Sequence, residues 1–169
     1  MGTVILIGMM GAGKTAVGRR AAEVLGLRFF DTDAMIEEKF RLSIPEIFEY
    51  EGEAGFREKE KVVIESLPDD EECVVSTGGG AFMFDENKEK FKAMGKTFYL
   101  RASLDTLMKR LENEQSQRPL LKGDMLQKLR KLLSEREAVY MQADYVIDVD
   151  EVSEMEIVQT IISIMESER

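Results

Sequence analysis

The sequence predicts a three-layer α/β/α protein, with helices on both faces of a central five-stranded parallel sheet. Five short apolar runs alternate with longer segments whose apolar residues recur at helical spacing, as in parallel strands joined by crossover helices. The first run leads directly into a glycine-rich loop and then into a helical pattern. With 44% hydrophobic and 33% charged residues, the chain has a globular composition, and we expect residues 1–169 to form a single domain.

Composition excludes several classes of function. The net charge of −10 has the wrong sign for a partner such as nucleic acid or an anionic membrane. The N-terminal apolar run ends at Gly8 without a basic leader and is too short to span a bilayer, so we expect no signal peptide and no transmembrane helix. The single cysteine, Cys73, cannot form an internal disulfide, which favours a cytoplasmic location. Because histidine is absent, a metal must be held by oxygen ligands, which favours Mg²⁺ over zinc.

A phosphate-binding loop is predicted at residues 8–15, which read GMMGAGKT and fit the pattern G-x-x-x-x-G-K-[ST]. A strand over residues 3–7 precedes the loop, and a helix that ends at Gly26 follows it. The glycines let successive backbone N–H groups face phosphate oxygens, and the helix adds the positive end of its dipole. We expect Lys14 to reach the β- and γ-phosphates and the Thr15 hydroxyl to bind Mg²⁺.

The second strand is expected over residues 27–30, and Asp31, Thr32 and Asp33 follow it. These three residues would lie at the carboxyl end of the strand, the edge of a parallel sheet where ligands bind. One carboxylate could support Mg²⁺ through water while the other contacts a substrate hydroxyl. Alternatively, Asp31 or Thr32 simply caps a helix that begins near Ala34.

A helix over residues 34–40 is followed by a second helical start behind Ser43, with Pro45 near its first position. Residues 51–60 come next, and an apolar-striped helix follows them through Leu67. Within residues 51–60, Arg57 and Glu60 lie three apart on one helical face.

The spacing of Arg57 and Glu60 leaves two alternatives open. The pair could be an ordinary surface ion pair that contributes little to stability. It could instead be a carboxylate that fixes the guanidinium for a substrate anion.

Three consecutive glycines, Gly78, Gly79 and Gly80, follow a third strand over residues 73–76. Such a run is costly in backbone entropy, so we expect it to allow close approach of the backbone to a ligand, although a flexible turn would have the same composition.

The remaining expected elements are a helix over residues 85–94 ended by Gly95, a strand over 97–100, a helix over 103–111 capped by Ser103, a long amphipathic helix over 124–141, a strand over 143–148 and a closing helix from Val152.

A mobile lid is expected at residues 112–123. The segment from residue 112 to 117 is polar and lacks a helical or strand pattern, and Arg118 follows it. A basic residue in such a segment can close over phosphates, because excluding water strengthens the electrostatics and prevents wasteful hydrolysis.

Taken in order, these motifs resemble those of the shikimate kinase family over nearly the full chain. The phosphate loop alone indicates only a nucleotide-binding superfamily, whereas the ordered set is far more specific. The matching segments are residues 8–15, FDTD at 30–33, the block from SIPEIF at 43–48 to GEAGFREKE at 52–60, TGGG at 77–80, RPLL at 118–121, and Arg136 before Tyr140.

The resemblance implies transfer of the γ-phosphoryl group of ATP to the 3-hydroxyl of shikimate, giving shikimate 3-phosphate and ADP, in chorismate and aromatic amino-acid biosynthesis. It also implies a P-loop kinase fold with strand order 2-3-1-4-5, a substrate-binding region near residues 32–61 and the lid near residues 112–123. Mg²⁺ is the implied cofactor. The implied partners are ATP and shikimate, and we expect a monomer.

The resemblance also assigns roles to single residues. Lys14, Asp33 and Arg118 are implied to be catalytic, and Thr15 and Asp31 to hold the metal, Asp31 through water. The implied ATP contacts are Gly11, Ala12, Gly13, Lys14, Thr15, Ala16, Arg110 and Arg118. The implied shikimate contacts are Asp33, Phe48, Phe56, Arg57, Gly78, Gly79, Gly80 and Arg136, with Arg57 and Arg136 on the carboxylate.

Arg110 matches its family counterpart less well. That counterpart lies against adenine, but the segment from Arg110 to Arg118 is longer here than in the family pattern. An ordinary solvent-facing helix arginine would look the same.

Two other functions stay open at this stage. A kinase of another small hydroxy acid, such as gluconate, would have to explain why Arg57, the glycine run and Arg136 occur in this order. A non-catalytic nucleotide-binding regulatory module is disfavoured by intact Lys14 and Asp33. We also hypothesise that Glu60 pre-sets Arg57 for the substrate.

Overall fold

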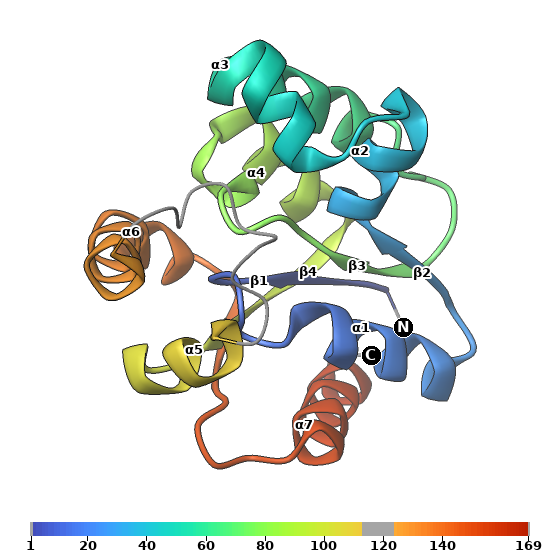
Figure 1. Ribbon diagram of the computed structural model, residues 1–169. Helices are drawn as coiled ribbons and strands as arrows, with labels where there is room; N and C mark the ends of the chain where they lie inside the picture. Colours follow the sequence, from blue (N-terminus) through green and yellow to red (C-terminus); the bar gives the residue numbers. More distant parts are fainter. Residues whose placement is uncertain (1, 113–123, 169) are drawn as a thin grey trace.

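The computed structural model describes residues 2–112 and 124–168. At its centre lies a five-stranded sheet in the order β2-β3-β1-β4-β5, and all four strand pairings are parallel (Figure 1). The predicted architecture and strand order are therefore confirmed. Of the expected lid, only Glu112 lies within the described residues, and Arg118 lies outside them. The strands are β1 (Thr3–Ile7), β2 (Arg28–Asp31), β3 (Cys73–Ser76), β4 (Gly95–Arg101) and β5 (Tyr145–Asp148).

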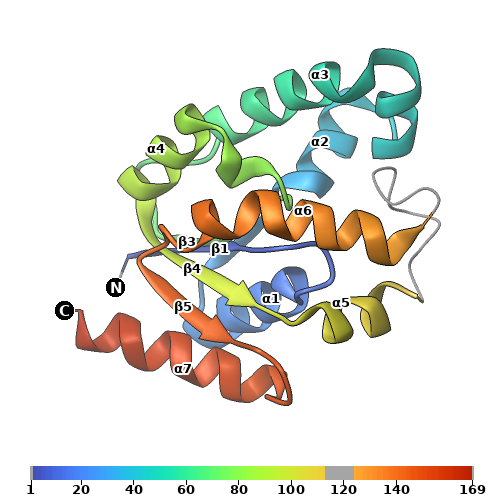
Figure 2. The same cartoon turned by 90° about the vertical axis from the view of Figure 1, so that its left-hand side faces the viewer.

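Helices cover both faces of the sheet (Figures 1 and 2). The first and last helices pack against each other on one face, while the third and fourth cover the opposite face. The helices are α1 (Lys14–Leu25), α2 (Thr32–Phe40), α3 (Ile44–Glu65), α4 (Asp85–Met94), α5 (Leu104–Leu111), α6 (Met125–Tyr140) and α7 (Glu154–Ser167), with a short 3₁₀ turn η1 (Ala81–Met83).

Local signals explain most helix ends. Gly26 ends α1 in the left-handed conformation at φ 70°, and its N–H donates to the last carbonyls of the helix. Ser43 begins α3 with a capping box, in which its side chain accepts from the Glu46 N–H and the Glu46 carboxylate accepts from the Ser43 N–H. Proline stands in the first turn of α3, where its missing N–H costs nothing.

Several boundaries differ from the sequence-based expectation. The second strand lies one residue later than predicted, and α2 begins at Thr32 because Asp31 caps it, accepting from the N–H groups of Asp33 and Ala34. Asp31 is therefore the helix cap, and its support of Mg²⁺ stays a prediction. Gly95 follows α4 in an extended conformation rather than a left-handed one, and a Cβ there would collide with the backbone of Thr3 on β1.

The helix α3 is continuous from Ile44 to Glu65 but contains a kink. At Gly52 the backbone has φ 72° and ψ −174°, so the helical turns before and after this residue meet at a kink. The sequence pattern predicts these two parts as separate helical segments. The kink matters for the site because Phe48 lies before it, whereas Phe56 and Arg57 follow it.

The apolar core has two parts. The main part fills both sides of the sheet. A second, smaller cluster lies between α2 and α3 and consists of Ile36, Ile47, Phe56 and Val63. Because this cluster ties α2 to α3, the expected substrate-binding region packs around apolar contacts of its own. Within the described residues, no helix is both long and apolar enough to cross a bilayer.

Candidate active site

The phosphate loop joins β1 to α1 at the carboxyl edge of the sheet. Gly11 and Gly13 have φ values of 84° and 95°, which only glycine adopts without strain. The Ala12 N–H donates to the Met9 carbonyl at 3.1 Å and closes the turn. The loop therefore curls tightly enough to present backbone N–H groups on its inner side.

Lys14 lies folded over this loop. Its Nζ donates to the carbonyls of Gly8 at 2.6 Å and Met9 at 2.8 Å, and only 8% of the residue is exposed. The neighbouring Thr15 and Ala16, in the first turn of α1, are exposed. The ammonium group is therefore held where the loop and the helix N-terminus meet.

Arg110, in the last turn of α5, contacts the loop as well. Its Nη1 donates to the Gly11 carbonyl at 3.2 Å and would lie 2.9 Å from a Cβ placed on Gly13. The residue is exposed, but it is not simply a solvent-facing arginine, because its guanidinium borders the phosphate loop. Its contact with adenine stays a prediction.

The two oxygens of Asp31 serve different partners. Oδ1 accepts the backbone N–H groups that begin α2, and Oδ2 accepts the Thr15 hydroxyl at 2.9 Å. The Ser76 hydroxyl at the end of β3 lies 3.5 Å from the Thr15 hydroxyl. Capping and proximity to Thr15 are thus compatible, and they bring hard oxygen atoms together beside the phosphate loop.

The glycine run is surrounded by charged side chains. A Cβ on Gly78 would lie 2.7 Å from Asp33 Oδ1 and 2.8 Å from Glu60 Oε2. A Cβ on Gly79 would lie 3.2 Å from Arg136 Nη1, and one on Gly80 would lie 2.9 Å from Arg57 Cζ. Four charged groups thus approach the glycine run closely, and the close approach of its backbone to a ligand stays a prediction.

Arg57 and Glu60 form a buried ion pair at 2.9 Å, with side chains 14% and 1% exposed. The alternative of an ordinary surface pair is therefore wrong. Burial raises the pKa of Glu60 to about 7; the Asp33 carboxylate adds to this effect, while the charges of Arg57 and Arg136 oppose it. A second carboxylate, Glu53, contacts Arg57 at 3.3 Å from the exposed side.

Several buried polar atoms of this cluster have no hydrogen-bond partner within residues 2–112 and 124–168. They are Arg57 Nε, Glu60 Oε2 and Arg136 Nη1. Arg136 comes from the distant helix α6, and the residue is 6% exposed. Buried polar atoms are almost always paired, so a bound ligand with polar groups is expected to contact them.

Aromatic rings line one wall beside these charges. The ring centroids of Phe48 and Phe56 are 5.0 Å apart, and the Arg57 guanidinium lies over the rings of Phe56 at 5.1 Å and Phe84 at 5.4 Å. The sequence does not single out Phe84, which precedes α4, because an isolated exposed phenylalanine carries no signal there.

The sequence motif contains Tyr140 but indicates no role for it. Its hydroxyl donates to the Gly79 carbonyl.

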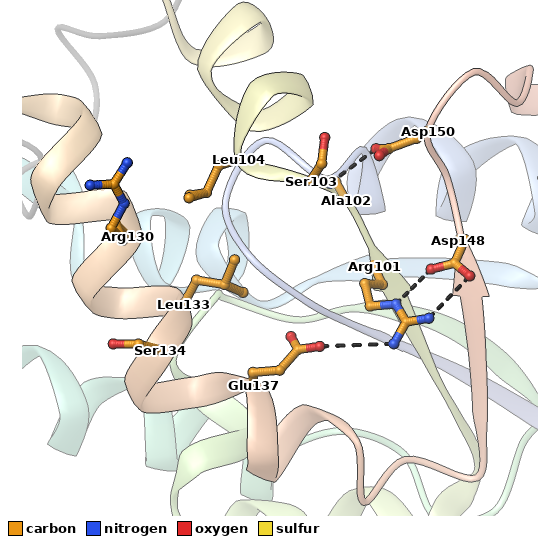
Figure 3. Close-up of a pocket in the computed structure, with 10 residues that line it drawn as sticks. All are labelled: Arg101, Ala102, Ser103, Leu104, Arg130, Leu133, Ser134, Glu137, Asp148 and Asp150. Carbon is orange, nitrogen blue, oxygen red and sulfur yellow. Dashed lines mark hydrogen bonds and ion pairs between the residues drawn. The ribbon is translucent and has the colours of Figure 1, made fainter.

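A separate hollow of about 520 Å³ lies between α5, α6 and the carboxyl ends of β4 and β5 (Figure 3). On its wall, Arg101 forms a two-point ion pair with Asp148, at 2.6 and 3.1 Å. None of the predicted site residues lines it. The hollow is therefore distinct from the cluster around the glycine run.

Comparison with known proteins agrees with this geometry. The family model described as shikimate kinase matches residues 10–166. A shikimate kinase of Methylococcus capsulatus is 43% identical over 165 residues, covering 96% of this chain and 92% of the relative, and one of Ruegeria pomeroyi is 46% identical over 149 residues, covering 88% and 76%. The structure of a shikimate kinase from Acinetobacter baumannii in complex with shikimate superposes with a TM-score of 0.95 at 39% identity, covering 100% of this chain and 95% of that one. This chain belongs to the shikimate kinase family.

Proposed function

We propose that this protein transfers the γ-phosphoryl group of ATP to the 3-hydroxyl of shikimate, giving shikimate 3-phosphate and ADP. The observation that supports this most is that two groups of residues meet at one edge of the sheet. The first half-site is the phosphate loop with Lys14, and the second is the glycine run with Arg57 and Arg136. Membership of the family names the acceptor.

The acceptor's carboxylate suits the two buried arginines. A guanidinium can make paired hydrogen bonds to a carboxylate, and both Arg57 and Arg136 have a buried N–H without a partner among the described residues. The backbone of Gly78, Gly79 and Gly80 lies between them. We place the carbon ring of the acceptor against Phe48 and Phe56, which form the apolar side of this half-site.

Asp33 is proposed to contact the ring hydroxyls and to receive the proton that the attacking hydroxyl loses. It stands in the first turn of α2, between Asp31 beside the phosphate loop and the glycine run. Glu60 faces the same glycine, Gly78, with its carboxyl oxygen. Since phosphoryl transfer requires mainly alignment and charge neutralisation, a modest base suffices.

The nucleotide is proposed to bind along the phosphate loop. The N–H groups from Gly11 to Ala16 face the phosphates, and Lys14 moves from the loop carbonyls to the phosphate oxygens. Arg110, already hydrogen-bonded to the loop, is proposed as the adenine contact. Arg118 is proposed to reach the phosphates.

Magnesium fits the residues present. The Thr15 hydroxyl and the Asp31 carboxylate are hard oxygen donors 2.9 Å apart, and Asp31 can act through water. When bound, Mg²⁺ neutralises charge on the phosphates and orients them. Among the described residues there is no group of three or more histidine, cysteine or acidic side chains arranged for a metal, so Thr15 and Asp31 would hold the ion together with oxygens of the nucleotide and water. A monomeric state and a cytoplasmic location stay predictions.

The test is ADP formation from Mg·ATP with shikimate, quinate, gluconate or no acceptor. We expect turnover that depends on shikimate, and its loss in Lys14→Ala and Asp33→Asn. Preference for gluconate would favour a kinase of another hydroxy acid. Nucleotide binding without turnover on any acceptor would favour a regulatory module instead.

A further inference from the structure

Tyr140, the last residue of α6, is fully buried, and its hydroxyl donates to the carbonyl of Gly79 in the middle of the glycine run. Its ring stacks on Tyr99 of β4, with centroids 4.8 Å apart and planes at 29°. The ring is thus held by the core, and the hydroxyl is directed at the backbone of the site. The family motif includes this tyrosine but gives it no task.

The glycine run needs such contacts because glycine restricts its own backbone least. The Gly78 N–H is held by the Thr32 hydroxyl at 3.0 Å, and the Gly78 and Gly80 carbonyls accept from Ala81 and Met83 at 3.1 Å each. Tyr140 supplies the corresponding contact for Gly79.

By holding the Gly79 carbonyl, Tyr140 also fixes the direction of the Gly80 N–H. The peptide between Gly79 and Gly80 is trans and planar, so the Gly80 N–H points opposite to the carbonyl. Within the described part of the chain, the N–H groups of Gly79 and Gly80 donate no hydrogen bond. Both groups can therefore donate to a ligand, and Tyr140 sets the direction of the Gly80 N–H.

Arg136 lies one helical turn before Tyr140, and its Nη1 would lie 3.2 Å from a Cβ on Gly79, the residue whose carbonyl Tyr140 holds. Burial raises the pKa of Tyr140 to about 12, and the charge of Arg136 opposes this shift. The phenol therefore remains a neutral donor near pH 7. Its hydrogen bond ties the end of α6, the helix that carries Arg136, to the backbone after β3.

We infer that Tyr140 is a positioning residue: its hydroxyl holds the Gly79 carbonyl, fixes the glycine run relative to the end of α6 that carries Arg136, and so aligns the donors that receive the acceptor's carboxylate. This inference rests on the proposed function. The hydroxyl contacts no reacting atom, so its loss weakens acceptor binding and leaves the nucleotide side unchanged.

Two matched variants test this inference. Tyr140→Phe and Tyr99→Phe each remove one hydroxyl from the same stacked pair, but the Tyr99 hydroxyl donates to Glu137, away from the glycine run. For Tyr140→Phe we expect the KM for shikimate and its Kd by calorimetry to rise about fivefold to tenfold, with the KM for ATP unchanged. For Tyr99→Phe we expect both constants to stay within about twofold of the wild type.

Each other outcome is informative. Equal shifts in the two variants would overturn the inference, because the effect would not be specific to the Tyr140 hydroxyl, and a normal KM in Tyr140→Phe would overturn it directly. Thermal melting of both variants separates these results from loss of fold. Absence of wild-type turnover with shikimate would instead contradict the proposed function, and with it this inference.

Discussion

At the scale of single residues, Glu60 connects more of the site than any pattern in the sequence suggested. It pairs with Arg57 at 2.9 Å, faces Asp33 across Gly78 and is almost completely buried. A buried carboxylate is costly unless it is paired, so its position is explained by what it does to Arg57.

We expect Glu60→Gln to raise the KM for shikimate by about tenfold, because the charge that orients the Arg57 guanidinium is lost. The KM for ATP should stay the same. Glu53→Gln is the matched control, since Glu53 contacts the same guanidinium at 3.3 Å but is 56% exposed. Steady-state kinetics on both variants is the measurement. An unchanged KM in Glu60→Gln would remove the positioning role.

Glu60 also makes stability depend on pH. Its pKa is about 7 in the folded protein, against an ordinary value of 4.5 for a solvated glutamate, so the folded state holds an extra proton between these values. The free energy of unfolding should therefore fall as pH rises through this window, relative to Glu60→Gln, by at most about 1.4 kcal/mol per pH unit. Urea denaturation at several pH values measures it.

The control for this pH dependence is Glu46→Gln. Capping by the backbone N–H and the hydroxyl of Ser43 lowers the pKa of Glu46, so its contribution is present above 4.5 and is lost as pH falls. Between pH 4.5 and 7, the difference in free energy of unfolding between wild type and Glu46→Gln should not change with pH, whereas the difference between wild type and Glu60→Gln should fall. If the difference for Glu60→Gln did not change either, the Glu60 carboxyl would titrate normally.

At the scale of elements, the kink in α3 sets the relative position of side chains in the proposed substrate-binding region. Gly52 has φ 72° and ψ −174°, a conformation open almost only to glycine, and a Cβ there would meet nothing within 4 Å. Gly26 offers a comparison, because it has φ 70° and ψ 30° and is equally open. Any effect of alanine at either position therefore comes from the backbone.

We expect Gly52→Ala to lower the free energy of unfolding by about 2 kcal/mol and Gly26→Ala by about 1 kcal/mol, since an ordinary residue reaches the left-handed helical region more easily than the region of Gly52. Only Gly52→Ala should also raise the KM for shikimate, because the kink separates Phe48 from Phe56 and Arg57. Thermal melting checks the stability changes, and steady-state kinetics checks the KM for shikimate. If this KM were the same in Gly52→Ala and Gly26→Ala, the kink would contribute to stability alone.

The elements show what sequence patterns can and cannot predict. Caps at Ser43, Ser103 and Gly26 depend on neighbouring residues, and they were found where the sequence placed them. The burial of Glu60 and the Tyr140 contact with Gly79 depend on residues far apart in the chain. Spacing showed that Arg57 could meet Glu60, but only the packing of α3 against the glycine run decides that the pair is buried.

At the scale of the whole molecule, the site divides between parts of the fold. The proposed nucleotide side comprises the β1–α1 loop and the end of α5, whereas the proposed acceptor side comprises residues of α2, α3, α6 and the segment after β3. They meet at the carboxyl edge of the sheet, as parallel α/β folds require. The order of motifs predicted this meeting, because successive strands end at the same edge.

This division predicts that each ligand stabilises the fold through its own residues. A ligand present at about 100 times its Kd adds about 2.7 kcal/mol, which raises Tm by about 5 to 10 °C for a chain of this size. Lys14→Met should lose the shift caused by ADP and keep the one caused by shikimate, because Lys14 lies on the phosphate loop. Arg136→Met should lose the shift caused by shikimate and keep the one caused by ADP, because Arg136 borders Gly79. Differential scanning fluorimetry with each ligand gives the four shifts, and loss of both shifts in a folded single variant would show that the two sides are not separable.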